Sequence, residues 1–145
     1  MRAVVDTNVW ISAFISPHGH PARVLGALLD GKFQAVFAQA VLDEVHDVLH
    51  RPRIATKYRL QPGAITAYVT GLEALGEVVP VTGDVRVSRD PKDDMLVEAA
   101  VLGRAAAIVS GDGDVRLDPA VTSYLAERGI QALSAREFLV RLQGT

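Results

Sequence analysis

The chain has 145 residues, of which 49% are hydrophobic and 22% are charged. This balance excludes disorder as the dominant state, and the length predicts a single domain spanning residues 1–145. The chain has no cysteine, which excludes disulfides and thiolate zinc sites. Its net charge of −2 excludes a global basic field that would attract nucleic acid, so any such contact must use a local patch.

The N-terminal segment carries no pattern of export or membrane insertion. It is apolar for only a few residues before Asp6, which is shorter than the apolar stretch of a signal peptide. No apolar run approaches the roughly 18 residues that indicate a membrane span. We therefore expect a cytoplasmic protein.

Strand and helix patterns alternate along the chain. In chain order they predict a strand at 3–5, helices at 10–15 and from 20 to Gly31, a strand at 34–38, a helix at 40–49, a helix from Pro62, a strand at 77–81, a helix at 94–102, a strand at 106–109, a helix at 119–128, a strand at 130–133, and a last helix from Ser134. This alternation predicts an α/β fold, a three-layer α/β/α sandwich around a mostly parallel sheet.

Carboxylates occur at the places where such a sheet gathers functional groups. Asp6 directly follows the first strand, and Asp112 follows the strand at 106–109. Sites form at the carboxyl ends of parallel strands, which brings these two acids together. Glu44 lies at the margin of the apolar face of the helix at 40–49, and Asp93 and Asp94 open the helix at 94–102.

A cluster of four acids requires a compensating cation. Two carboxylates about 5 Å apart repel by roughly 3 kcal/mol at an effective dielectric constant near 20. A site made only of oxygen ligands favours Mg²⁺ or Mn²⁺. Simpler interpretations stay open at individual positions: Asp90 followed by Pro91 fits a helix N-cap, Asp93 favours the helix dipole, and Asp114 fits a turn.

Four segments in this order resemble a known family. They are Val-Val-Asp-Thr-Asn-Val at 4–9, the helix acid Glu44, Asp-Pro-Lys-Asp-Asp at 90–94, and Ile-Val-Ser-Gly-Asp-Gly-Asp at 108–114. Together they resemble a PIN domain, of the subgroup labelled as toxin components of toxin–antitoxin pairs. The resemblance covers nearly the whole chain, through residues 132–139.

The resemblance implies an α/β/α sandwich and a Mg²⁺- or Mn²⁺-dependent endoribonuclease that cleaves single-stranded RNA with a metal-activated water. It assigns both the catalytic and the metal-binding roles to Asp6, Glu44, Asp94 and Asp112. Asp94 is favoured over Asp93 because Val97 then falls on the apolar position of the family three residues later. Ser110 replaces the usual threonine of the family and keeps its hydroxyl.

Two surfaces are candidates for partners. A predicted loop carries the basic residues Arg51, Arg53, Lys57 and Arg59, which could hold RNA phosphates or an acidic segment of an antitoxin, or could simply be solvated. Arg86, Arg89 and Lys92 form a second, weaker basic candidate. We also expect a homodimer through part of the apolar surface formed by Leu25, Leu28, Leu29, Ile65, Tyr68 and Leu72.

The main alternative is a non-catalytic acidic α/β module, either a degenerate RNA-binding PIN-like domain or a receiver-like domain. A receiver needs a phosphoacceptor aspartate after its third strand and a lysine after its fifth, and the acids here do not follow that order. A haloacid-dehalogenase-like phosphatase needs Asp-x-Asp after the first strand, where Asn8 holds the second position.

Overall fold

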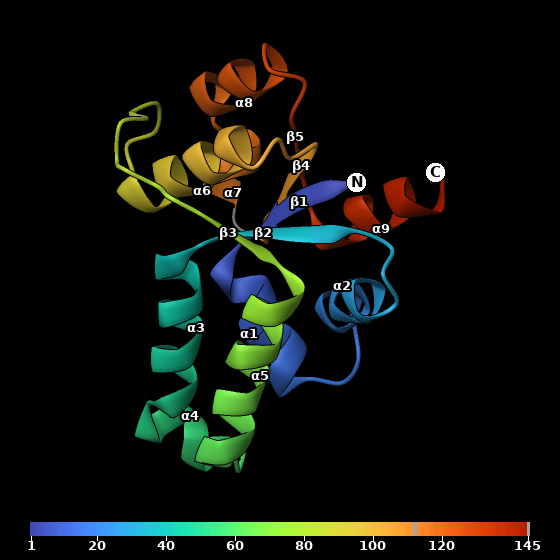
Figure 1. Ribbon diagram of the computed structural model, residues 1–145, viewed down its shortest axis with the longest axis vertical. Coiled ribbons are helices and arrows are strands. Elements are labelled where there is room, and N and C mark those ends of the chain that lie inside the picture. Colours follow the sequence, from blue (N-terminus) through green and yellow to red (C-terminus); the bar gives the residue numbers. More distant parts are fainter. Residues whose placement is uncertain (112, 145) are drawn as a thin grey trace.

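A central sheet of five parallel strands organises the molecule (Figure 1). The computed structural model describes residues 1–111 and 113–144. The strands lie in the order β3-β2-β1-β4-β5, and their bounds are β1 (Arg2–Val5), β2 (Gln34–Ala38), β3 (Glu77–Val79), β4 (Ala107–Val109) and β5 (Gln131–Leu133). Because β1 is the central strand, the residue that follows it lies in the middle of one sheet edge.

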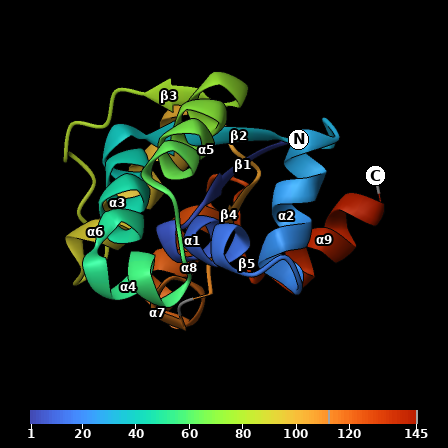
Figure 2. The same cartoon turned by 90° about the horizontal axis from the view of Figure 1, so that it is seen from below.

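Helices cover both faces of the sheet (Figures 1 and 2). One face carries α1 (Thr7–Ile15), α2 (His20–Leu29), α3 (Gln39–His50) and α5 (Pro62–Leu75), and α4 (Pro52–Lys57) packs against α3 at its end away from the sheet. The other carries α6 (Pro91–Leu102), α7 (Gly113–Leu117) and α8 (Pro119–Ala126), while α9 (Ala135–Gln143) packs against α2. The predicted α/β/α sandwich is therefore confirmed. In the part of the chain that the structure describes, no helix has the length and hydropathy needed to cross a membrane.

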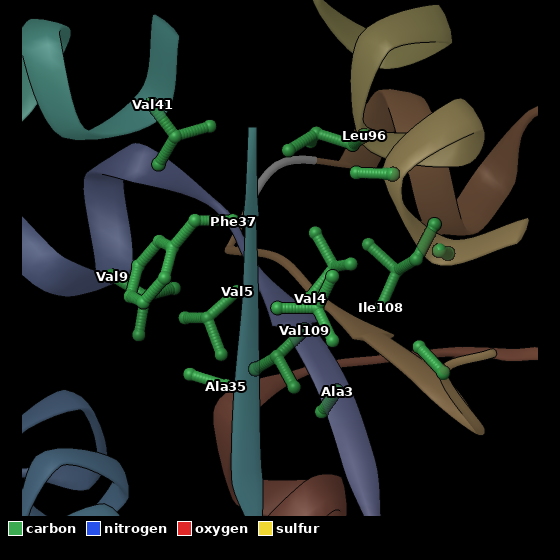
Figure 3. Packing of buried hydrophobic residues seen from close by; sticks show 14 of the residues in the cluster. Ala3, Val4, Val5, Val9, Ala35, Phe37, Val41, Leu96, Ile108 and Val109 are labelled. Atoms are coloured by element: carbon green, nitrogen blue, oxygen red, sulfur yellow. The ribbon is translucent and has the colours of Figure 1, made fainter. Parts of the chain in front are cut away.

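The core consists of strand side chains that alternate between the two helical layers. Figure 3 shows Val5 and Phe37 on the side of α1, and Val4 and Ile108 on the side of α6. All four side chains are buried, as is Trp10 of α1. Both faces of β1 are covered, which is why its sequence is an unbroken apolar run rather than an alternating one.

The predicted elements are largely confirmed, with a few differences. The segment at 51–59, predicted as a loop, contains the short helix α4, and a second short helix that was not predicted, α7, begins at Gly113. The last helix begins at its N-cap Ser134 as predicted, with a capping box in which the Ser134 and Glu137 side chains each accept the other residue's backbone N–H. The helix predicted at 94–102 begins earlier, at Pro91.

Most of the surface expected to form a homodimer belongs to the core. Leu28, Ile65 and Leu72 are buried within the protein, and Tyr68 donates a hydrogen bond to the carbonyl of Trp10. Leu29, with 63% of its surface exposed, remains available. Homodimerisation stays a prediction.

Candidate active site

A small polar cleft lies where the carboxyl end of β1 meets α3 and the N-terminal end of α6. Its volume is about 160 Å³, and it is lined by Asp6, Thr7, Asn8, Glu44, Asp90, Lys92, Asp93, Met95 and Leu96. A larger hollow of about 630 Å³ between α2 and α9 contains none of the predicted acids. The cleft therefore brings together two predicted site residues, Asp6 and Glu44.

Asp6 is held in place by a backbone hydrogen bond to β4 and by a buried hydroxyl. Its backbone N–H donates to the carbonyl of Val109 over 2.8 Å, which continues the pairing of β1 with β4. The Ser110 hydroxyl, at the end of β4 and fully buried, donates to Asp6 Oδ2 over 3.1 Å. The carboxylate thus has a fixed orientation toward the cleft.

Glu44 enters the cleft from α3 and makes two contacts. Its Oε2 accepts a hydrogen bond from the Thr7 hydroxyl over 3.3 Å, and its Oε1 lies 3.0 Å from Lys92 Nζ. The hydrogen bond to Glu44, and then its charge, raise the pKa of Lys92 above its ordinary value, with further contributions from Asp90 and Asp6. The marginal position predicted for Glu44 on α3 matches its half-buried side chain.

Of the two neighbouring acids Asp93 and Asp94, Asp93 is the one that lines the cleft. Asp93 is only 4% exposed and lines the cleft, where its Oδ2 lies 3.5 Å from the Ser88 hydroxyl. The Asp94 carboxylate instead accepts the backbone N–H groups of Val87 and Ser88, over 2.8 and 2.7 Å. The assignment of Asp94 to the site therefore stays a prediction, and Asp93 is the acid of this pair that lines the cleft.

The register of α6 explains why Asp93 rather than Asp94 lines the cleft. Asp90 is the N-cap of α6, as predicted, and its side chain accepts the N–H of Lys92. Asp93 then shares a face with the buried Leu96 and Val97, three and four residues later, and points toward the sheet. Asp94 shares the adjacent face with Glu98.

The face of α6 that carries Asp94 and Glu98 holds the β3–α6 loop, residues 80–90. Figure 1 shows this loop extending from the sheet. Glu98 is 5% exposed and accepts hydrogen bonds from the N–H groups of Thr82, Gly83 and Asp84 and from the Thr82 hydroxyl. Burial alone would raise the pKa of the Glu98 carboxyl, but these hydrogen bonds outweigh it and hold the pKa below its ordinary value.

The remaining predicted acid, Asp112, lies outside the described residues, as does the side chain of Asp114. The strand that leads to Asp112 is described, and its last residues run beside Asp6. The place of Asp112 in the site therefore stays a prediction from the sequence.

Comparison with known proteins assigns the fold to a family. The PIN domain family matches residues 2–114, which is most of the chain. The chain is a member of the PIN domain family. It is also similar to the uncharacterized protein MJ1680 of Methanocaldococcus jannaschii, with 27% identity over 115 residues that cover 79% of this chain and 73% of that protein.

Membership in the PIN domain family indicates a general class of activity. PIN domains are generally nucleases, and they typically use a divalent metal. The oxygen donors in the cleft of this PIN domain suit such a cation, because Asp6, Glu44, Asp93 and Asn8 offer only carboxylate and amide oxygens. Among the described side chains, however, no three acids or histidines form a ready-made metal cluster.

The basic segment of this PIN domain is a helix with exposed charges. Arg51, Arg53 and Lys57 belong to or flank α4, and all three are exposed, as is Arg59 after its end. Lys57 Nζ lies 5.2 Å from the centre of the Tyr58 ring. We call Arg51, Arg53, Lys57 and Arg59 the α4 basic patch. α4 directly follows α3, the helix that carries Glu44.

Two features of the site were not predicted from the sequence. The ion pair between Lys92 and Glu44 joins residues 48 positions apart, and no local pattern indicates it. The inward position of Asp93 could have been found, because the N-cap at Asp90 and the apolar residues Leu96 and Val97 together fix which face of the helix is buried.

Proposed function

We propose that this PIN domain is a metal-dependent endoribonuclease that cleaves single-stranded RNA. The observation that carries the proposal is the convergence of Asp6, Glu44 and Asp93 from three separate elements on one cleft at the carboxyl edge of a parallel sheet. A surface with no function would have no reason to collect three acids that repel one another. The match to the PIN domain family supports the nuclease class.

The side chains of the cleft have distinct tasks in this proposal. Asp6, Glu44 and Asp93 would hold Mg²⁺ or Mn²⁺, with Asp112 as a further ligand by resemblance. The chemistry that a divalent cation supplies in such a site is activation of water and neutralisation of charge at the phosphodiester. Ser110 and Thr7 hold the carboxylates of Asp6 and Glu44 in the orientations that binding requires.

The chemistry is tested by the ends of the RNA fragments. We expect single-stranded RNA to be cut internally in the presence of Mn²⁺ or Mg²⁺, and EDTA to abolish the cleavage. Attack by water leaves a 5′-phosphate and a 3′-hydroxyl, which can be identified by enzymatic end-labelling and mass spectrometry. Cyclic 2′,3′-phosphate ends would instead show attack by the RNA's own 2′-hydroxyl and would contradict the use of activated water.

We further propose that the α4 basic patch captures the substrate. The acidic cleft repels RNA at long range, so phosphates must first be held by cations beside it. The double substitution Arg51→Glu with Arg53→Glu should weaken RNA binding, and the slope of log affinity against log salt should fall by about 1.4, which is two phosphate contacts to a single strand. Fluorescence anisotropy at several salt concentrations measures both quantities.

A matched control makes this prediction specific. Lys32 and Arg104 are also exposed, but they precede β2 and β4 and so lie at the opposite edge of the sheet from the cleft. Lys32→Glu with Arg104→Glu changes the net charge equally and should leave the salt slope close to that of the parent. An unchanged slope after the substitutions in the α4 basic patch would sink its assignment as the RNA-binding surface.

The resemblance to toxin components supports a biological setting. In that setting the protein would be the toxin of a toxin–antitoxin pair in the cytoplasm, and an acidic segment of the antitoxin would cover the α4 basic patch. RNA would then be excluded without any contact between the antitoxin and the cleft. A small gene immediately upstream whose product co-purifies with this protein and restores growth in its presence would support this role.

A further inference from the structure

Lys92 places a positive charge directly against one of the proposed metal ligands. Its Nζ lies 3.0 Å from Glu44 Oε1, and it lines the same cleft as Asp6 and Asp93. A lysine at the start of a helix is unfavourable with respect to the helix dipole, so its place in the first turn of α6 has no local explanation. The ion pair with Glu44 across the cleft explains why a lysine stands at this position.

The backbone of Lys92 is fixed, but its ammonium can move. The N-cap Asp90 accepts the Lys92 N–H over 2.9 Å, which anchors the residue to the first turn of α6. The Lys92 side chain is 68% exposed, whereas that of Glu44 is 28% exposed. The ammonium therefore reaches Glu44 from the mouth of the cleft and can withdraw into solvent without disturbing the core.

The ammonium and a divalent cation would compete for the same oxygen. The described acids do not form a ready-made metal cluster, and one Glu44 oxygen is already occupied by Lys92 and the other by Thr7. Two cations against one carboxylate repel each other, which disfavours their simultaneous presence. We propose that Lys92 is a positioning residue that occupies Glu44 in the metal-free protein and is displaced from it when the divalent metal binds.

This proposal rests on the proposed function and adds a specific consequence to it. Because metal binding has to break an ion pair, Lys92 lowers the affinity of the cleft for metal. Exposed ion pairs of this kind are weak, so we expect Lys92→Met to tighten Mn²⁺ binding by about 2- to 5-fold. A purely structural role for Lys92, in which it holds Glu44 ready for the metal, predicts the opposite sign.

The test is a calorimetric titration of Mn²⁺ into the parent, Lys92→Met and three further variants. Arg89→Met removes the same charge from an exposed residue just before α6 and should change the affinity by less than about 2-fold, because no ion pair with the cleft acids is broken. Lys92→Arg keeps the charge and the ion pair, so it should bind Mn²⁺ no more tightly than the parent. Thermal unfolding of each variant confirms that the fold is retained, and Lys92→Gln serves as a second charge-removing substitution.

The outcomes separate the two proposals. Equal or weaker Mn²⁺ binding by both Lys92→Met and Lys92→Gln would overturn the role of Lys92 while leaving the metal-dependent nuclease in place. If Arg89→Met tightened Mn²⁺ binding as much as Lys92→Met does, the cause would be the loss of a positive charge anywhere near the cleft. That result would also overturn the proposed role of Lys92. Absence of Mn²⁺ binding in the parent and in every variant would contradict the proposed function, and the role of Lys92 with it.

Discussion

Replacing Asp6 by Asn should abolish Mn²⁺ binding and lower the rate of RNA cleavage by about 100-fold or more. The loss follows from removing a charged oxygen ligand from the middle of the cleft. The fold should persist, because the amide oxygen of Asn can still accept the hydrogen bond that Ser110 donates. Cleavage of labelled RNA and calorimetry with Mn²⁺ measure the two effects, and circular dichroism checks the fold.

Asp93 and Asp94 provide a matched pair for the same experiment. Asp93→Asn alters the cleft and should lose cleavage as Asp6→Asn does. Asp94→Asn alters a carboxylate that accepts N–H groups of the β3–α6 loop, and its amide oxygen can still accept them, so most of the activity should remain. Full activity of Asp93→Asn together with inactivity of Asp94→Asn would show that the acid favoured by the sequence resemblance, not the one in the cleft, is functional.

The architecture could be predicted from the sequence because each strand and helix carries its own local signal. The apolar run before Asp6 marks a strand buried on both faces, and the structure buries Val4 and Val5 on opposite sides of the sheet. Because strands and helices alternate, the strands run parallel, and Asp6 then lies at the edge of the sheet where their carboxyl ends meet. The short helix α4 escaped prediction because Pro52 both ends α3 and begins α4, and a proline after a helix is usually read only as a stop.

The candidate site was predicted only in part because its remaining features depend on tertiary contacts. Asp93 and Asp94 are chemically identical neighbours, and only the register of α6 against the sheet separates their tasks. The engagement of Glu44 by Lys92 requires α3 and α6 to meet across the sheet edge, which neither helix encodes locally. No local pattern indicates the contacts of Glu98, because they are made by backbone N–H groups of the loop that follows β3.

Replacing Glu98 by Gln should reduce the stability of the fold. In Glu98→Gln the amide nitrogen must face at least one of the backbone N–H donors of Thr82, Gly83 or Asp84, so one hydrogen bond is lost and the others lose their charge. Charge-assisted hydrogen bonds of buried groups contribute about 1.5–3 kcal/mol, which predicts a loss of about 2–3 kcal/mol. For a chain of this length that lowers the melting temperature by about 6–12 °C.

The same substitution should release the β3–α6 loop. Arg86 and Arg89 are exposed within this loop, so trypsin should cut there faster in Glu98→Gln than in the parent. Glu73→Gln, which changes an exposed glutamate on α5, is the matched control and should alter neither the melting temperature nor the cleavage rate. A melting temperature that falls equally in both variants would contradict the role of Glu98 in holding the loop.

The effect of Glu98 on stability should also depend on pH in a defined direction. The pKa of Glu98 is lower in the folded protein than its ordinary value of about 4.3, because backbone N–H groups stabilise the ionised carboxylate. Ionised Glu98 therefore stabilises the fold fully at pH above about 4.3, and this contribution is lost as the pH falls through the lower folded pKa. The difference in unfolding free energy between the parent and Glu98→Gln, measured by urea denaturation from pH 7 to pH 3, should be constant near neutrality and should shrink below about pH 4.3. A difference that grows toward acid pH would mean that the carboxyl group is protonated in the folded protein, and that it does not hold the loop as an anion.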